Sequence, residues 1–313
     1  MTLAEYASGG IVTAFIFYLL ALLAHSAEWA SLRGVPLRDT SATALAADDD
    51  EFDPARLRSD MFGRLGVILT GLGALSQLAG VVARGVAAGR APWGNMYEFL
   101  TAALLFAVVA YMFGVSRWGL RWLGLPMTLL LSVGNGLAVT VFYVEIAPLV
   151  PALHSVWFII HIVAACISAA AFNLGALASI VYLVKRSAVL RAEKRSPENP
   201  TLTGIMARVP SLASIDRFAY RAHAFGFPIW TFTIAAGSIW AEYAWGRFWG
   251  WDPKETWSLV TWVVYAAYLH ARATAGWKGR NAAIIAVVGI ASFWFNFIGV
   301  NLLVSGLHSY AGI

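Results

Sequence analysis

Eight long apolar segments, separated by polar stretches, dominate the pattern of this chain. A helix needs about 20 mostly apolar residues to cross about 30 Å of hydrocarbon, and each segment is long enough to span. Strict alternation of apolar and polar residues is absent, so helices rather than membrane strands are expected. The pattern therefore predicts an all-α polytopic membrane protein with about eight transmembrane helices. The expected spans cover about residues 10–28, 62–84, 98–115, 121–144, 156–184, 222–242, 256–272 and 282–306.

The polar stretches suggest a division of the chain. The first apolar segment is not expected to be a cleavable signal peptide. Such peptides begin with a basic region, whereas residues 1–10 contain Glu5 and no lysine or arginine. Residues 29–61 carry an acidic run and are expected to form a solvated loop, and residues 185–221 are expected to form a linker at the membrane surface. We therefore expect a first span with a cytoplasmic loop over residues 1–61, and a larger transmembrane domain over residues 62–313.

The distribution of lysine and arginine predicts the orientation in the membrane. If the N-terminus lies outside, 18 of the 22 basic residues fall in inside segments. Cytoplasmic segments of membrane proteins carry such an excess of positive charge, so both termini are expected to be extracytoplasmic. The basic residues left outside are Arg84, Arg90, Arg247 and Lys254.

Composition narrows the possible functions. The chain is 59% apolar and only 12% charged, whereas soluble domains carry roughly a quarter charged residues, so a soluble enzyme is excluded. Cys166 is the single cysteine, which excludes an internal disulfide, a CxxC redox site and a c-type haem attached to the chain itself. The net charge of +5 is explained by basic cytoplasmic loops, and no nucleic-acid partner is expected.

The six histidines fall into two groups along the predicted helices. Neutral imidazole is a common axial ligand of haem iron, and ligation from both faces of a porphyrin needs two of them. The alternative for any single histidine is that it forms hydrogen bonds within the membrane and coordinates no iron. The outer group is His154, His161 and His308, and the inner group is His25, His223 and His270.

The most unusual feature is a tryptophan-rich block at residues 240–262, WAEYAWGRFWGWDPKETWSLVTW, which holds six of the 14 tryptophans. An interfacial aromatic belt is one explanation. A belt does not explain this density in one connection, nor Gly246 and Gly250, which are expected to let the backbone approach a flat guest. Pro253 is expected to start a helix capped by Asp252. Indole faces offer apolar stacking area, so a planar apolar macrocycle is the natural guest.

This block resembles the tryptophan-rich WWD signature of the haem-handling protein superfamily. Within it, the chain is most similar to the CcsA/ResC type of system II cytochrome c biogenesis, called CcsB in some actinobacteria. The resemblance covers residues 62–313. Further matching segments are PWGNMYEF at 92–99, PALHSVW at 151–157, YLHAR at 268–272 and GLHSY at 306–310.

The resemblance implies roles for particular residues. His161 and His308 match two external histidines that ligate haem over the tryptophan surface. His270 matches a histidine within the membrane that serves a second, inner haem position, and its partner ligand comes from another subunit. His25, His154 and His223 are assigned no role. The residues expected to contact haem, besides the three histidines, are Trp245, Trp249, Trp251, Trp257 and Asp252.

The implied function is cytochrome c maturation at the outer face of the plasma membrane. Haem b is held outside, and the thiols of a CxxCH motif in apocytochrome c add to its vinyl groups. The chain would be a subunit of a holocytochrome c synthase, with a CcsB/ResB-type membrane partner and a thiol-reducing thioredoxin-like protein. Asp252 is expected to be structural, and no residue is assigned a catalytic role. Arg247 and Lys254 could face haem propionates or lipid headgroups.

Three other functions remain open from the sequence. An electron-transfer subunit of the cytochrome b kind would place paired histidines inside the helices. A haem exporter without an attachment role would need the same residues as a haem-attaching protein. A transporter or channel is disfavoured, because no predicted span carries a central carboxylate.

Overall fold

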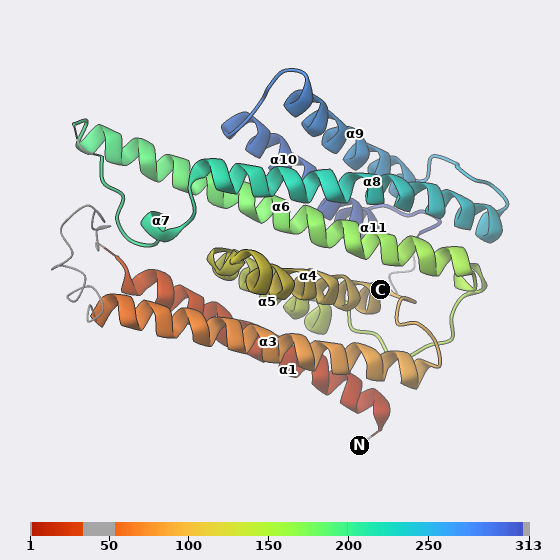
Figure 1. Cartoon of the computed structure of the whole chain (residues 1–313). Coiled ribbons are helices and arrows are strands. Elements are labelled where there is room, and N and C mark those ends of the chain that lie inside the picture. Colours follow the sequence, from red (N-terminus) through yellow and green to blue (C-terminus); the bar gives the residue numbers. More distant parts are fainter. Residues whose placement is uncertain (1, 34–53, 199, 309–313) are drawn as a thin grey trace.

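The structure, a computed structural model, describes residues 2–33, 54–198 and 200–308, and these residues form helices joined by short connections (Figure 1). The all-α prediction is confirmed. Two short helical turns, η2 (Leu120–Leu123) and η3 (Pro151–Leu153), and a π-helical turn, η4 (Phe295–Gly299), interrupt the connections and the last helix. The α-helices are α1 (Leu3–Ser31), α3 (Pro54–Ala88), α4 (Met96–Trp118), α5 (Gly124–Thr140), α6 (Val156–Arg195), α7 (Ile205–Arg208), α8 (Leu212–Trp245), α9 (Pro253–Ala273), α10 (Arg280–Trp294) and α11 (Val300–Leu303).

Seven of the described helical segments are long and apolar enough to cross a membrane, which confirms a multi-pass protein. The one predicted span not among these seven, residues 256–272, corresponds to α9, which has 21 residues and therefore the required length. It is less apolar than the other seven because ionisable residues stand at both of its ends. They are Lys254, Glu255, His270 and Arg272.

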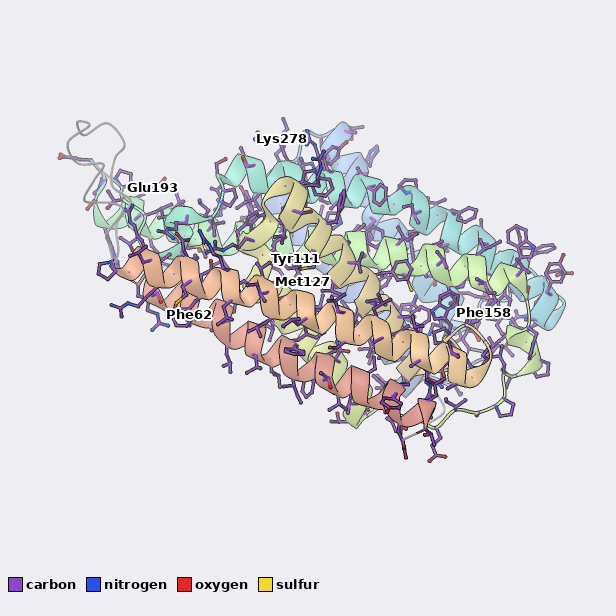
Figure 2. The ribbon with its side chains drawn as sticks, turned by 60° about the horizontal axis from the view of Figure 1, so that its bottom comes forward. Phe62, Tyr111, Met127, Phe158, Glu193 and Lys278 are labelled. Atoms are coloured by element: carbon purple, nitrogen blue, oxygen red, sulfur yellow. The ribbon has the colours of Figure 1, made fainter. Side chains whose placement is uncertain are left out.

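The long helices run roughly side by side and alternate in direction (Figure 1). The α1–α3 pair forms one side of the bundle, α4 and α5 lie in the middle, and α6 and α8 separate them from α9 and α10. Tyr111 and Met127 are fully buried in this interior (Figure 2). We call the end at which α4, α6 and α9 begin and α8 ends the tryptophan-rich end, because residues 246–252 connect α8 to α9 there.

Close packing of α1 on α3 follows from small residues at regular intervals. The buried positions of α3 recur every three or four residues, as in a left-handed helix pair, and include Gly66, Gly73 and Gly80. A Cβ added at Gly73 would lie 2.6 Å from the Tyr18 ring, so glycine allows that ring to sit against the helix. The hydroxyl of Tyr18 donates to Oε1 of Gln77 at 2.7 Å, which satisfies the phenol inside the apolar bundle.

Helices α6 and α8 are longer than the spans predicted within them. At about 1.5 Å per residue, 40 and 34 residues correspond to about 60 Å and 51 Å, well beyond a hydrocarbon core of about 30 Å. The expected linker at residues 185–221 is therefore largely helical, since α6 continues to Arg195 and α8 begins at Leu212. The acidic run at residues 48–51, in the expected cytoplasmic loop, lies outside the described residues.

The basic-residue distribution predicts that the tryptophan-rich end faces the outside. Glu145 and Ser196 are both exposed; Glu145 lies in the connection before α6, and Ser196 directly follows α6. In intact cells, a membrane-impermeant maleimide should label Glu145→Cys, whereas Ser196→Cys should react only after the membrane is permeabilised. The parent chain provides the background, because Cys166 is buried. Labelling with the reverse pattern would contradict the orientation.

Candidate functional site

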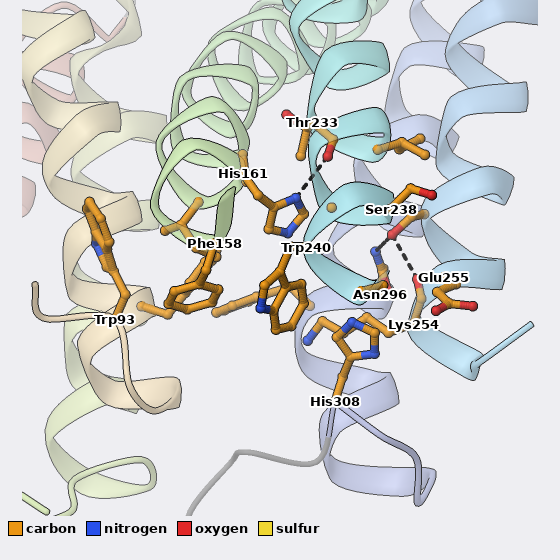
Figure 3. Close-up of a pocket in the computed structure, with 18 of the residues that line it drawn as sticks. Trp93, Phe158, His161, Thr233, Ser238, Trp240, Lys254, Glu255, Asn296 and His308 are labelled. Carbon is orange, nitrogen blue, oxygen red and sulfur yellow. Dashed lines mark hydrogen bonds between the residues drawn. The ribbon is translucent and has the colours of Figure 1, made fainter. Parts of the chain in front are cut away.

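A pocket opens at the tryptophan-rich end, with about 1140 Å³ of empty space including its open mouth. Residues from α4, α6, α8, α9 and η4 line it, together with the segment after α11. Most of the lining is apolar or aromatic, as in sites that enclose a flat organic ligand. Figure 3 shows Trp93 and Phe158 on one side and Lys254 and Glu255 on the other.

His161 lines the pocket from the second turn of α6. Its Nδ1 lies 2.8 Å from the backbone carbonyl oxygen of Thr233, which can only accept, so Nδ1 carries the proton. Nε2 of the neutral ring is then left with a lone pair. Gly237, on α8, makes this contact possible, because a Cβ there would lie 2.7 Å from His161 Nδ1.

His308 lines the same pocket from the segment after α11. Its Nδ1 donates to Oδ2 of Asp252 at 2.8 Å, while the backbone N–H of Leu307 donates to Oδ1 at 2.8 Å. Although burial alone raises the pKa of Asp252, the hydrogen bonds from His308, Leu307 and the Lys254 backbone lower it to about 2. Asp252 is therefore ionised near neutral pH, and it fixes the proton of His308 on Nδ1.

The connection between α8 and α9 is organised by caps. The side chain of Asp252 accepts from the backbone N–H of Lys254 at 3.1 Å, and Pro253 occupies the first helical position. Asp252 is thus the N-cap of α9, which confirms the sequence prediction. Glu255 completes the capping box and also accepts from Gly250 N–H at 2.9 Å.

Two glycines of the connection, Gly246 and Gly250, have structural roles within the chain. Gly246 ends α8 in the left-handed conformation, with φ 68°, where glycine carries no steric cost. At Gly250, the guanidinium of Arg247 occupies the place of the missing Cβ. Both glycines therefore shape the chain itself.

The four tryptophans predicted to contact haem lie in different surroundings. Trp249 lines the pocket, and Trp245 packs edge-on against His308 with ring centroids 4.8 Å apart. Trp251 is 68% exposed and has φ 59°, a strained backbone conformation for a bulky residue. Trp257 packs on Phe295, with ring centroids 4.3 Å apart, and does not line the pocket.

Trp240 was not singled out from the sequence, yet its indole lies between the two imidazoles (Figure 3). Its ring stacks on His161 at 5.9 Å and meets the His308 ring edge-on at 5.6 Å. The indole N–H donates to the Ala152 carbonyl at 2.8 Å. Its position as the first tryptophan of the block was a signal in the sequence, but which face of α8 it occupies was not.

Segment 92–99 holds the other side of the pocket in place. Glu98 is fully buried and accepts from Arg84 at 2.9 Å, from Arg90 at 2.7 Å and from Gly94 N–H at 2.8 Å. These contacts tie the end of α3 and the following loop to α4. They thereby position Trp93, a pocket residue that we had not assigned.

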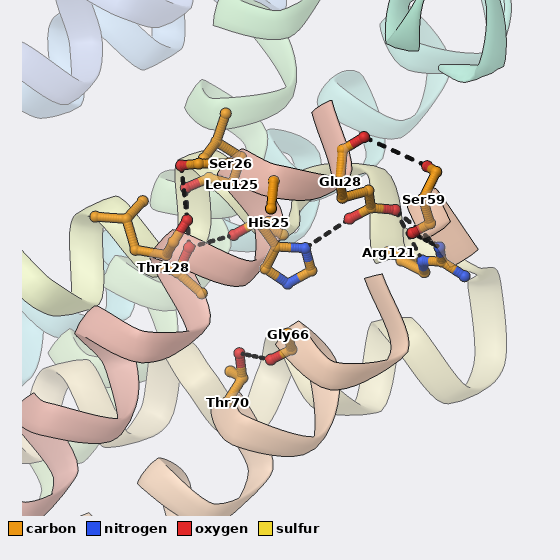
Figure 4. Close-up of polar contacts among 12 residues, drawn as sticks. His25, Ser26, Glu28, Ser59, Gly66, Thr70, Arg121, Leu125 and Thr128 are labelled. Carbon is orange, nitrogen blue, oxygen red and sulfur yellow. Dashed lines mark hydrogen bonds and ion pairs between the residues drawn. The ribbon is translucent and has the colours of Figure 1, made fainter. Parts of the chain in front are cut away.

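The remaining histidines lie apart from this pair. His154 is exposed, and its ring contacts the Leu149 carbonyl at 3.3 Å. His25 is buried and donates to Glu28, whose other oxygen accepts from Arg121 (Figure 4).

His223 and His270 differ in their surroundings, although both belong to the predicted inner group. His223 is fully buried and packs against Tyr265 and Tyr268, with ring centroids 5.1 and 4.9 Å away. His270 is exposed on α9. The predicted inner group is therefore not one cluster.

The donor set of the pocket fits the iron of a bound macrocycle. Each imidazole donates from Nδ1 to an acceptor, so Nε2 is the atom that each ring can offer to a metal beside an apolar aromatic cavity. Among the described residues, no group of three or more His, Cys, Asp or Glu side chains is arranged to hold a bare metal ion.

Known proteins that resemble this chain belong to one family. A family model described as "Cytochrome C assembly protein" matches residues 93–308. The chain belongs to this family. The "Cytochrome c biogenesis protein CcsA" of Guillardia theta is 37% identical over 239 residues, covering 72% of this chain and 79% of that protein. The protein of the same name from Porphyra purpurea is 35% identical over 277 residues, covering 79% and 87%.

A solved structure of "Cytochrome c Heme Lyase CcmF" shares the fold, with a TM-score of 0.60 at 15% identity. The match covers 95% of this chain and 47% of that chain. This member of the cytochrome c assembly family is therefore a CcsA-type, system II, multi-pass membrane protein of cytochrome c maturation.

The two roles of Asp252 predict unequal effects of two substitutions. Asp252→Asn keeps an N-cap side chain but weakens the bond to His308, which should cost about 1 kcal/mol of unfolding free energy. Asp252→Ala removes both contributions and should cost about 2 kcal/mol. Equilibrium unfolding in detergent, followed by tryptophan fluorescence, measures both changes. Equal losses for the two variants would show that the cap contributes nothing.

Proposed function

We propose that this chain holds haem b at the outer face of the plasma membrane, between His161 and His308, and presents it for attachment to apocytochrome c. The observation that carries the proposal is the pair of imidazoles in one aromatic pocket, both protonated on Nδ1. Helix packing brings them together although 147 residues separate them in the sequence.

The contacts around Trp240 define what the pocket must do to accept the macrocycle. Because the indole lies between the two imidazoles, ligation of one iron by both requires this ring to leave that space. Its bond to the Ala152 carbonyl would break in the process. Trp240 and Trp249 then offer indole faces against which the macrocycle can pack.

The two ligands differ in their partners at Nδ1, and this difference bears on release. A carboxylate partner raises the basicity of an imidazole more than a neutral carbonyl does. His308, bonded to Asp252, is therefore the stronger ligand, and His161, bonded to the Thr233 carbonyl, the weaker. We propose that the histidine of the client's CxxCH motif replaces His161.

The attachment chemistry needs no nucleophile from this chain. Each client thiol adds across one vinyl double bond, with sulfur bonding to one carbon and hydrogen to the other, so the step consumes no oxidant. Cys166, the one cysteine here, is buried and takes no part. The role of this chain is to ligate iron, hold the macrocycle and exclude water, as the synthase subunit that binds haem.

The delivery route and the partners complete the proposal. His270 is exposed on α9, the least apolar long helix, which fits an inner haem position shared with a CcsB/ResB-type subunit. A thioredoxin-like protein would keep the client thiols reduced. Residues 62–313 would form the haem-handling domain, with residues 1–61 as a first span and cytoplasmic loop. A cytochrome b role is less well supported, because buried His25 and His223 lie in packed surroundings outside the pocket.

Chemical rescue tests the ligand pair. His161→Gly and His308→Gly should each lose the low-spin haem spectrum and cytochrome c maturation. Added imidazole should restore both, because the glycine leaves an imidazole-sized gap beside the iron. The visible spectrum of the purified protein and the yield of holocytochrome c are the measurements.

The control for rescue is His154→Gly, which alters an exposed histidine outside the pocket and should change neither readout. If both ligand variants keep an unshifted Soret band, and imidazole changes nothing, shared ligation by His161 and His308 is wrong.

The inner position generates a separate prediction. His270→Ala should lower the haem that reaches the pocket from inside, while haem added from outside still binds between His161 and His308. The haem content of protein purified from cells, compared with the same protein reconstituted in detergent, separates the two steps. Normal haem content and normal cytochrome c yield in this variant would remove His270 from the route.

A further inference from the structure

Lys254 is the one cationic side chain among the described residues that line the pocket. It is the second residue of α9, and Figure 3 shows it on the same side of the pocket as His308 and Glu255. Its ammonium nitrogen lies 5.8 Å from the centroid of the Phe297 ring. The charge is therefore held within a largely apolar cavity.

Two acidic residues, Asp252 and Glu255, lie close to Lys254 in the sequence, and the hydrogen bonds of both carboxylates go to other groups. The Asp252 carboxylate accepts from His308, from Leu307 N–H and from Lys254's own backbone N–H. Glu255 accepts from Gly250 N–H and Asp252 N–H through Oε2, at 2.9 and 3.0 Å, and its Oε1 has no hydrogen-bond partner among the described residues. Neither carboxylate forms an ion pair with the Lys254 ammonium within the described part of the chain.

An unpaired cation in an apolar cavity is costly unless a counter-ion reaches it. The N-terminus of α9 is already capped by the side chains of Asp252 and Glu255. The Lys254 ammonium is therefore the positive group that still lacks an ion-pair partner among the described residues of the pocket. A carboxylate brought in by the guest would supply that partner.

We infer that Lys254 binds a propionate carboxylate of the haem, an inference that rests on the proposed function. Haem carries both propionates on one edge, and its vinyl groups lie on other edges that are apolar. A single cation at one side of the pocket therefore orients the macrocycle as well as holding it. The carboxylate edge faces the start of α9, and the vinyl edge faces away from Lys254.

Arg247 is the other cation of the connection and provides a matched control. Its guanidinium lies over Gly250 and does not line the pocket. A propionate reached by charge alone, or a lipid headgroup at the membrane surface, would interact with Arg247 as readily as with Lys254. A propionate bound inside the pocket would depend on Lys254 alone.

The experiment compares haem with its dimethyl ester, in which both carboxylates are neutral. Each is titrated in detergent into the parent chain, Lys254→Met, Lys254→Arg and Arg247→Met, and the Soret band reports binding and ligation. The parent and Arg247→Met should bind haem about tenfold more tightly than the ester, as expected for a charge-assisted hydrogen bond. Lys254→Met should bind the two alike, with its ester affinity unchanged, and Lys254→Arg should recover part of the preference.

The outcomes separate this inference from the proposed function. If Lys254→Met still prefers haem, or if the parent binds haem and ester equally, propionate binding by Lys254 is overturned while ligation by histidine stands. If only Arg247→Met loses the preference, Arg247 holds the carboxylate instead. Absence of a bis-histidine spectrum in the parent with either ligand would overturn the proposed function and this inference with it. The haem-to-ester ratio is measured within each variant, so a general loss of folded protein does not imitate the expected result.

Discussion

The Asp252 carboxylate joins two parts of the chain on which the pocket depends. One oxygen accepts from Leu307 N–H, and the other from His308 Nδ1 and from the first turn of α9. The same side chain therefore starts a helix, fastens the segment after α11 and fixes the tautomer of an imidazole. Without this carboxylate, His308 would have no counterpart to the Thr233 carbonyl that orients His161.

The two sides of the bundle solve the problem of polar groups in a membrane differently. On the α1–α3 side, buried polar side chains such as Tyr18 and Gln77 bond to one another, and glycines let the helices approach closely. On the pocket side, the Nδ1 protons of the histidines are satisfied while their Nε2 atoms are left free. The Tyr18 and Gln77 side chains thus satisfy one another, whereas the two pocket histidines retain bonding capacity for a guest.

Sequence patterns predicted the helices and the Asp252 cap because these depend on local composition and spacing. The sequence also predicted that many tryptophans lie near the site, but it did not predict which way their side chains point. Hydropathy indicates that a residue is buried away from water. Which aromatic ring faces the cavity depends on the rotation of α8 about its axis. Trp240 consequently lies between the imidazoles and Trp251 points outward, and the distinction between Lys254 and Arg247 likewise depended on tertiary packing.

The contacts of His308 also determine when, during synthesis of the chain, the pair of imidazoles can form. α1 and α3 hold one another through contacts made within the first 88 residues, so they can pair early as the chain enters the membrane. The imidazole pair, in contrast, combines residue 161 with residue 308 and needs Asp252 from between them. A nascent chain still held by the ribosome short of residue 308 therefore lacks one of the two imidazoles, and the pair is complete only when translation has passed that point.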